Sequence, residues 1–192
     1  MKKLFILLFA MMMFSLNAQK SLTPPVGLSF GMNLESAKQK LDPIGTFDES
    51  VTAVYGKRIT YYNVKIGSTV SDMMGCKFVN DKLYEVVIFY DATHSEIENK
   101  YNSLCAIITD KYGEGQSYRN FKYPYEDKAS DIEMAIKGGY ANIATYWLKQ
   151  FNNEDGISVK ITSGMAIMLI YQHGVLTNEA INISTIKDKN AF

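Results

Sequence analysis

Residues 83–90 read Leu-Tyr-Glu-Val-Val-Ile-Phe-Tyr, and this stretch decides the fold. β-Branched and aromatic side chains dominate it, and such side chains fit the pleated surface of a sheet. Asn80 and Asp81 stand just before it, and both residue types tolerate the positive φ angles of a two-residue hairpin turn. The sequence therefore predicts an antiparallel hairpin over residues 73–90, whose second arm is a central strand.

Alternation of apolar residues marks further strands on both sides of this hairpin. Residues 73–79 place three apolar side chains on one face: Met74, Cys76 and Phe78. Residues 58–66 alternate in the same way, with one face made of Thr60, Tyr62, Val64 and Ile66. The other predicted strands cover residues 51–55, 142–151, 157–162 and 165–172.

Residues 94–112 carry the clearest helical pattern. Apolar side chains recur there every three or four positions, which places them along one face of a helix. Thr93 or Ser95 can cap its start, and Gly113 is the glycine that commonly ends a helix. The predicted stripe consists of Ile97, Tyr101, Leu104, Ile108 and Tyr112.

Three shorter helices are also predicted. The first is capped by Asn33 and stops before Pro43, because the residue that precedes a proline avoids the α region. The other two cover residues 129–137 and 177–187, and the last of these is only weakly amphipathic.

The order of these elements predicts two similar halves, at about residues 28–92 and 93–176. Each half runs from a helix into a three-stranded antiparallel meander. This order is typical of the α+β class, with helices packed on one face of an antiparallel sheet. The length of the chain after its leader fits a single domain over residues 19–192.

The N-terminus has the pattern of a secretory signal peptide over residues 1–18. Lys2 and Lys3 precede an uncharged apolar run, and small residues follow up to Ala18. The run is too short to span a bilayer, which takes about 20 apolar residues. We expect cleavage near Ala18 and export, with the bacterial periplasm as the default destination. An uncleaved N-terminal anchor is the alternative.

Composition limits the classes of partner. The chain has 20 basic and 20 acidic residues, and removal of Lys2 and Lys3 would leave a net charge near −2. Such a balance provides no electrostatic footprint for nucleic acid or for an anionic membrane. The most hydrophobic later run, residues 166–171, has the length of a buried strand, so we expect no membrane span in the mature chain.

Residues 30–35, Phe-Gly-Met-Asn-Leu-Glu, open the first predicted helix. They resemble the Gly-Met-(Thr/Ser)-x-x-Glu-Val opening of the SmpA/BamE envelope-assembly lipoproteins. The repeated helix-then-meander unit is similar to the tandem fold of β-lactamase inhibitor protein, and exported bacterial domains of this kind often have a Trp-bearing strand such as residues 144–148. The chain departs from the lipoproteins at Ser36 and Ala37 and has no lipobox cysteine. The resemblance implies an α+β fold and carries over no functional residue.

The two cysteines allow two interpretations. Export permits a disulfide between Cys76 and Cys105, which would close a loop of about 30 residues. A helix over a sheet, however, keeps facing Cα atoms near the upper limit for bridging. The alternative is two buried thiols that act as small hydrophobic groups.

No catalytic residue, metal site or cofactor is predicted. His94 and His173 fall at a helix start and a strand end, where histidines are usually solvated. Residues 152–156 place oxygen ligands in a loop but lack the twelve-residue calcium pattern, so a solvated turn is expected.

Residues 115–125 are predicted to form an irregular, aromatic-rich loop followed by the acidic residues Glu126, Asp127, Asp131 and Glu133. Tyr and Arg are enriched where interfaces concentrate binding energy. The alternative is that some rings cover the sheet while others are singly exposed. The predicted binding residues are Tyr118, Arg119, Phe121, Tyr123, Tyr125 and Trp147.

These patterns together favour an exported, non-enzymatic binding or protein-interaction module. Its partner would be another envelope protein or a peptide. Two alternatives stay open: an exported hydrolase that uses acidic residues, and a structural partner in envelope assembly that recruits by strand addition.

Overall fold

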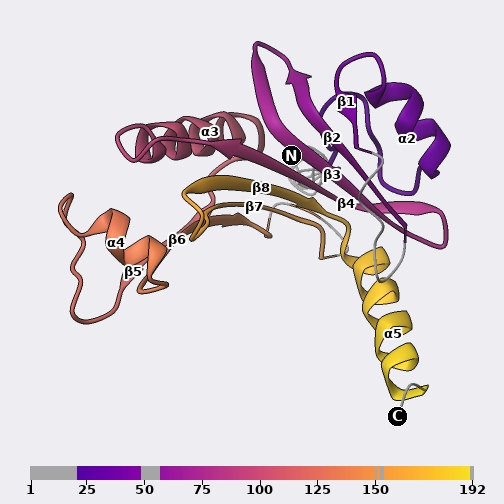
Figure 1. The fold of residues 1–192 in the computed structure, drawn as a ribbon. Coiled ribbons are helices and arrows are strands. Elements are labelled where there is room, and N and C mark those ends of the chain that lie inside the picture. The colour runs from indigo at the N-terminus through magenta and orange to yellow at the C-terminus, as the bar shows by residue number, and fades with distance from the viewer. Residues whose placement is uncertain (1–20, 49–56, 150, 152–153, 191–192) are drawn as a thin grey trace, which may run out of the picture.

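The structure is a computed structural model that describes residues 21–48, 57–149, 151 and 154–190 (Figure 1). The predicted leader at residues 1–18 and the predicted strand at residues 51–55 lie outside the described residues.

An eight-stranded antiparallel sheet organises the chain, in the order β1-β2-β3-β4-β8-β7-β6-β5. The α+β class and the antiparallel sheet are thereby confirmed. The strands are β1 (Thr46–Phe47), β2 (Lys57–Ile66), β3 (Thr69–Val79), β4 (Lys82–Asp91), β5 (Gln116–Phe121), β6 (Ala141–Trp147), β7 (Gly156–Ile161) and β8 (Ala166–Gln172).

The helices of the described chain lie before, between and after these strands. α3 runs over β7 and β8, whereas α5 projects from the sheet and contacts β3 and β4 (Figure 1). Their bounds are α2 (Leu34–Leu41), α3 (Ile97–Tyr112), α4 (Ile132–Lys137) and α5 (Gly174–Asn190).

The β3–β4 hairpin has the predicted turn. Asn80 and Asp81 adopt φ angles of 46° and 60°, the left-handed pair that matches the twist of the two strands. β4 lies at the centre of the sheet because its other edge pairs with β8, where Val86 faces Tyr171. The last strand of one half therefore joins the last strand of the other.

The helices differ in how their N-termini are capped. The Asn33 side chain accepts a hydrogen bond from Ser36 N at 2.8 Å, as predicted for α2. α3 begins at Ile97, later than predicted, and has no side-chain cap at its N-terminus. α5 begins earlier than predicted, because the Asp155 carboxylate accepts a hydrogen bond from Gly174 N at 2.9 Å.

One hydrophobic core joins side chains of the sheet to side chains of the helices α2, α3 and α4. The predicted stripe of α3 is confirmed, with Ile97, Tyr101, Ile108 and Tyr112 buried and Leu104 half-buried. Removal of apolar surface from water is the main force that holds these layers together. The largest fully buried side chains include Trp147, Tyr61, Phe78, Leu28, Leu41 and Met74.

Two local predictions are wrong. Val64 is buried together with Tyr61, while Tyr62 is exposed, so the alternation predicted for residues 58–66 does not hold. The left-handed φ of 54° at Asn63 lies where the alternation changes. Residues 116–121, predicted to be irregular, form the edge strand β5, which pairs with β6 on one side only.

Candidate functional site

The sheet face opposite the core is hollowed where β5 and β6 lie side by side. We call this concavity, which has a volume of about 600 Å³, the β5–β6 hollow. Its lining residues come from both strands and the segments next to them: Glu114, Gly115, Gln116, Tyr118, Asn142, Tyr146, Leu148 and Lys149.

The alternation of strand residues explains why two tyrosines reach this hollow. In β6, Thr145 and Trp147 are buried, so Tyr146 between them points to the opposite face. In β5, the Ser117 hydroxyl meets the Thr145 hydroxyl at 2.9 Å on the core side, so Tyr118 also points away from the core. The two tyrosine rings pack edge to face, with centroids 5.6 Å apart and planes at 77°.

Trp147 forms part of the support beneath the hollow. Its side chain is fully buried, and its Nε1 donates a hydrogen bond to the Gly113 carbonyl at 2.8 Å. A Cβ atom at Gly115 would lie only 2.6 Å from Trp147 Cε2, so the chain can pass over the indole only as glycine. The prediction that Trp147 binds a partner is therefore wrong, because packing against the core removes its ring from the surface.

Polar groups surround the tyrosine pair. Gln116 and Asn142 are exposed, and each carries an amide that both donates and accepts hydrogen bonds. Glu114 and Lys149 contribute one charge of each sign. The hollow therefore combines aromatic surface, amides and balanced charge.

The predicted aromatic residues do not form one cluster. Tyr118 lines the hollow with 39% of its surface exposed, whereas Tyr123 is 94% exposed and is not among the lining residues. Phe121 is half-buried against the core. Tyr125 packs on Tyr140, with ring centroids 5.2 Å apart. The structure thus brings one member of the predicted set, Tyr118, into the hollow.

Arg119 has a structural environment. Its Nε is 2.7 Å from Asp127 Oδ2, and its Nη2 is 2.8 Å from Glu98 Oε1 of α3. The hydrogen bonds to Asp127 raise the pKa of Arg119 and lower the pKa of Asp127. The predicted binding residue Arg119 therefore joins β5 to α3 and to the loop that follows β5.

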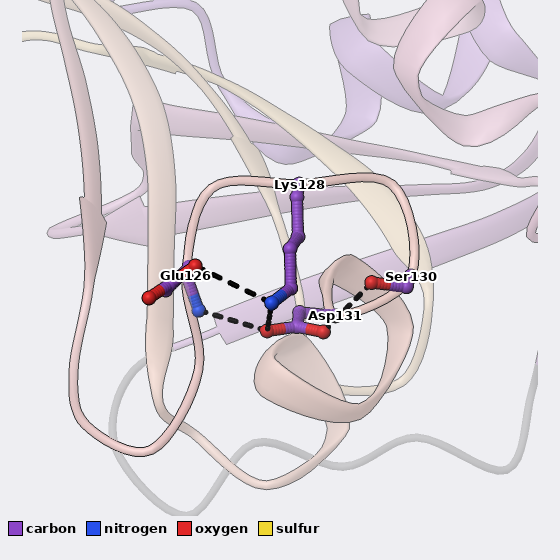
Figure 2. Close-up of polar contacts among 4 residues, drawn as sticks. All are labelled: Glu126, Lys128, Ser130 and Asp131. Carbon is purple, nitrogen blue, oxygen red and sulfur yellow. Dashed lines mark hydrogen bonds and ion pairs between the residues drawn. The ribbon is translucent and has the colours of Figure 1, made fainter.

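The acidic segment before α4 is held by its own contacts (Figure 2). Asp131 accepts a hydrogen bond from Glu126 N at 3.0 Å and one from the Ser130 hydroxyl at 2.9 Å. Lys128 pairs with both Glu126 and Asp131. The hydrogen bond from Glu126 N lowers the pKa of Asp131, and the one from Lys137 lowers the pKa of Glu133. A general acid needs a raised carboxyl pKa, and the pKa shifts of Asp131 and Glu133 have the opposite sign.

Both cysteines are free thiols, and Cys76 is the buried one of the two. Cys76 is fully buried in β3, and burial raises the pKa of its thiol to about 12. Cys105 is half-buried in α3, where burial raises its thiol pKa. A raised pKa keeps a thiol protonated and unreactive at neutral pH.

The two histidines occupy different environments. His94 is exposed, with Nδ1 3.5 Å from Glu133 Oε2. His173 is half-buried, accepts a hydrogen bond from Leu176 N at 3.3 Å and packs edge to face on Phe30. The prediction of a solvated side chain is therefore wrong for His173, which supports the start of α5.

The described residues hold neither a metal-binding cluster nor a helix that could cross a membrane. They contain no group of three or more His, Cys, Asp or Glu side chains arranged to hold a metal ion. None of the helices among them combines the length and apolarity needed to cross a membrane.

Sequence reasoning missed most of the hollow. The predicted binding residues do not include four members of the lining: Gln116, Asn142, Tyr146 and Leu148. Tyr146 could have been found, because it stands next to the buried Trp147 in a strand and must point the other way. The amides had no signal, because their proximity depends on the β5–β6 register, which places Gln116 opposite Tyr146.

No known relative guides the interpretation of the fold and the hollow. The resemblance to SmpA/BamE and to β-lactamase inhibitor protein therefore stays a prediction. Comparison of the chain with protein family models, with curated proteins and with solved structures found no match.

Proposed function

We propose that the chain is an exported, non-enzymatic binding module whose ligand enters the β5–β6 hollow. The observation that carries this proposal is a concavity of about 600 Å³ with Tyr118 and Tyr146 at its surface. Ligand sites commonly measure about 300–1,000 Å³ and combine apolar walls with a few polar groups. The ligand would belong to the envelope, as a peptide, a protein segment or another envelope component.

The rigidity of the hollow supports binding. Its two tyrosines and two amides lie on the paired strands β5 and β6, and the Trp147–Gly113 hydrogen bond holds the backbone just before β5. Tyrosine also loses little conformational entropy on binding, because it has only two side-chain torsions. A surface that is already ordered therefore binds at a lower entropic cost than a flexible loop.

An exported hydrolase has weaker support. Glu114 is the single carboxylate among the residues that line the hollow. Acid–base hydrolysis of a glycoside commonly uses two carboxylates, one of them with a raised pKa. The pKa values of Asp127, Asp131 and Glu133 are instead lowered by their hydrogen-bonding partners.

A structural role in envelope assembly is favoured by one observation. β5 is an edge strand of the sheet, and of its six side chains only Phe121 is not exposed. An edge of this kind can accept an added strand from a partner. Such a partner would contact the backbone of β5 rather than the hollow.

Nuclear magnetic resonance separates these modes of binding. The mature chain would be titrated with soluble extract of bacterial envelope while the side-chain amide signals of Gln116 and Asn142 are followed. We expect these signals to shift in the wild type and not in the Tyr118→Ala/Tyr146→Ala double variant. Tyr123→Ala is the matched control and should behave as wild type, because Tyr123 is exposed outside the hollow.

Two other results would count against this proposal. Protection of the β5 backbone amides from hydrogen exchange, without side-chain shifts, would favour strand addition. Equal shifts in the wild type and the double variant would remove the hollow as the site.

Export has its own test. The full chain would be expressed in a bacterium, recovered by osmotic shock and analysed by N-terminal sequencing. We expect the mature protein to begin at or within a residue or two of Gln19. Recovery of a chain that retains Met1 from the membrane fraction would instead support the uncleaved anchor.

A further inference from the structure

We infer that the β5–β6 hollow binds a neutral, polyhydroxylated ligand, namely a saccharide. This inference rests on the proposed function, because it names the class of ligand for the same site. It follows from three properties of the lining: its charge balance, its amides and its edge-to-face tyrosine pair.

The charges of the lining argue against an ionic ligand. Glu114 and Lys149 give the hollow no net charge. Arg119 lies on the core side of β5 and is paired with Glu98 and Asp127, so it adds no positive charge for an anion. A ligand with a phosphate or a carboxylate would find no surplus cation among these residues. A neutral ligand avoids this cost.

The amides match a ligand with many hydroxyl groups. Gln116 lies opposite Tyr146 in the β5–β6 register, and Asn142 lies two residues along β6 from Ala144, which is the partner of Tyr118. Each amide supplies an oxygen acceptor and an NH₂ donor. A sugar hydroxyl is both a donor and an acceptor, so neighbouring hydroxyls can bond to both ends of one amide. A purely apolar ligand would leave these amides without partners.

The tyrosine pair provides flat apolar surface. In an edge-to-face pair, one ring covers only one face of the other, and Tyr118 keeps 39% of its surface exposed. The C–H faces of a sugar ring are apolar and can lie against such a surface, while the phenol hydroxyls stay available for hydrogen bonds. Leu148, which is 56% exposed, adds an aliphatic contact beside them.

The test uses defined probes on the mature chain. Cellobiose, maltose and N,N′-diacetylchitobiose represent neutral saccharides, digalacturonic acid a charged one, and trialanine a peptide. We expect at least one neutral disaccharide to shift the Gln116 and Asn142 side-chain amide signals at millimolar concentration. Its dissociation constant should change less than about twofold between 50 and 500 mM NaCl, because no ion pair is screened.

Variants locate the effect. Tyr146→Ala should weaken disaccharide binding at least about tenfold, and Asn142→Asp should also weaken it, because this substitution removes the NH₂ donor. Tyr123→Ala and Tyr62→Ala are the matched controls. Each also replaces an exposed tyrosine by alanine, but at a position outside the lining, so both variants should bind the disaccharide as the wild type does.

The outcomes separate the two proposals. If trialanine or digalacturonic acid shifts the same signals while the neutral disaccharides do not, the saccharide inference is wrong and the hollow is still a binding site. If no probe shifts them and the Tyr118→Ala/Tyr146→Ala variant responds to envelope extract as wild type does, both proposals fail. A circular dichroism spectrum of each variant shows whether it has folded.

Discussion

The two halves of the sheet share a topology but carry different surfaces. In each half, four strands follow one another from an edge of the sheet to its middle. The first half consists of β1–β4 with α2 and the second of β5–β8 with α3, and the halves meet at the β4–β8 pair (Figure 1). Both halves bury one sheet face, and the largest fully buried side chains are Tyr61 in the first half and Trp147 in the second, with Phe78 next in size. The interior is therefore built alike on the two sides.

The difference lies on the opposite face and at the edges. In the first half, Lys77 and Glu85 form an ion pair at 2.6 Å, and the Arg58 side chain lies over Gly75. In the second half, the equivalent face carries the β5–β6 hollow with its tyrosine pair. The edge strand β1 has two residues and β5 has six. One topology thus supports two surfaces, because residues that face solvent are not constrained by the core.

Loss of a large core side chain should have the greatest effect and should test whether the halves unfold together. Trp147→Ala and Phe78→Ala should each lower the free energy of unfolding by about 3–5 kcal/mol, because both leave a cavity. Urea unfolding followed by far-ultraviolet circular dichroism should give one transition for each variant. Two separate transitions would contradict the single continuous sheet as one cooperative unit.

Replacement of one glycine in each half by alanine should show that the second half tolerates less change at its backbone than the first. Gly115→Ala should cost about 1–3 kcal/mol, because the new Cβ would lie 2.6 Å from Trp147 and 2.7 Å from Thr145. Gly75→Ala should change stability by less than about 1 kcal/mol, because its Cβ would meet the flexible Arg58 side chain at 3.5 Å. Equal urea midpoints for the two variants would show that the indole contact does not constrain Gly115.

Alkaline pH should weaken the first half through Cys76. The thiol has an ordinary pKa of 9.0 in the unfolded chain, and burial raises its pKa to about 12 in the folded protein. The protonated thiol therefore makes its full contribution to the free energy of unfolding below pH 9, and this contribution is lost as pH rises from 9 toward 12. The loss between pH 9 and 10 should be about 1 kcal/mol for this group.

The matched variant for this effect is Cys76→Ala. Its free energy of unfolding should fall less steeply than that of the wild type over the same pH interval, although buried tyrosines such as Tyr171 also contribute a slope. Identical slopes in the two proteins would mean that Cys76 ionises equally in both states.

The smallest expected effect concerns the side-chain contact that links the sheet to a helix in each half. Arg119→Gln removes the ion pair between β5 and Glu98 of α3 and should cost about 0.5–1 kcal/mol, because these groups are partly exposed. This cost should shrink at 1 M NaCl. Tyr61→Phe removes the hydrogen bond to Asp42, next to α2, and its cost should depend less on salt. Thermal unfolding at two salt concentrations measures both, and equal salt dependence would contradict this assignment.

Local patterns predicted much of this fold because their causes are local. The turn at Asn80 and Asp81 follows from the φ angles that these residues tolerate. The cap at Asn33 and the apolar stripe of α3 follow from hydrogen bonds and spacings within a few residues. β5 escaped prediction because an edge strand with exposed side chains has no apolar alternation to reveal it.

The sequence by itself determined the type of most elements, the α+β class and the residues available for the surface. Tertiary structure alone decided that β4 meets β8, that Trp147 turns inward while Tyr146 turns outward, and that Gln116 comes to lie opposite Tyr146. The reason is physical: the strand pairings join residues distant in the chain, and burial of a common core selects one register, and with it the face that each strand residue occupies, among those that local preferences permit.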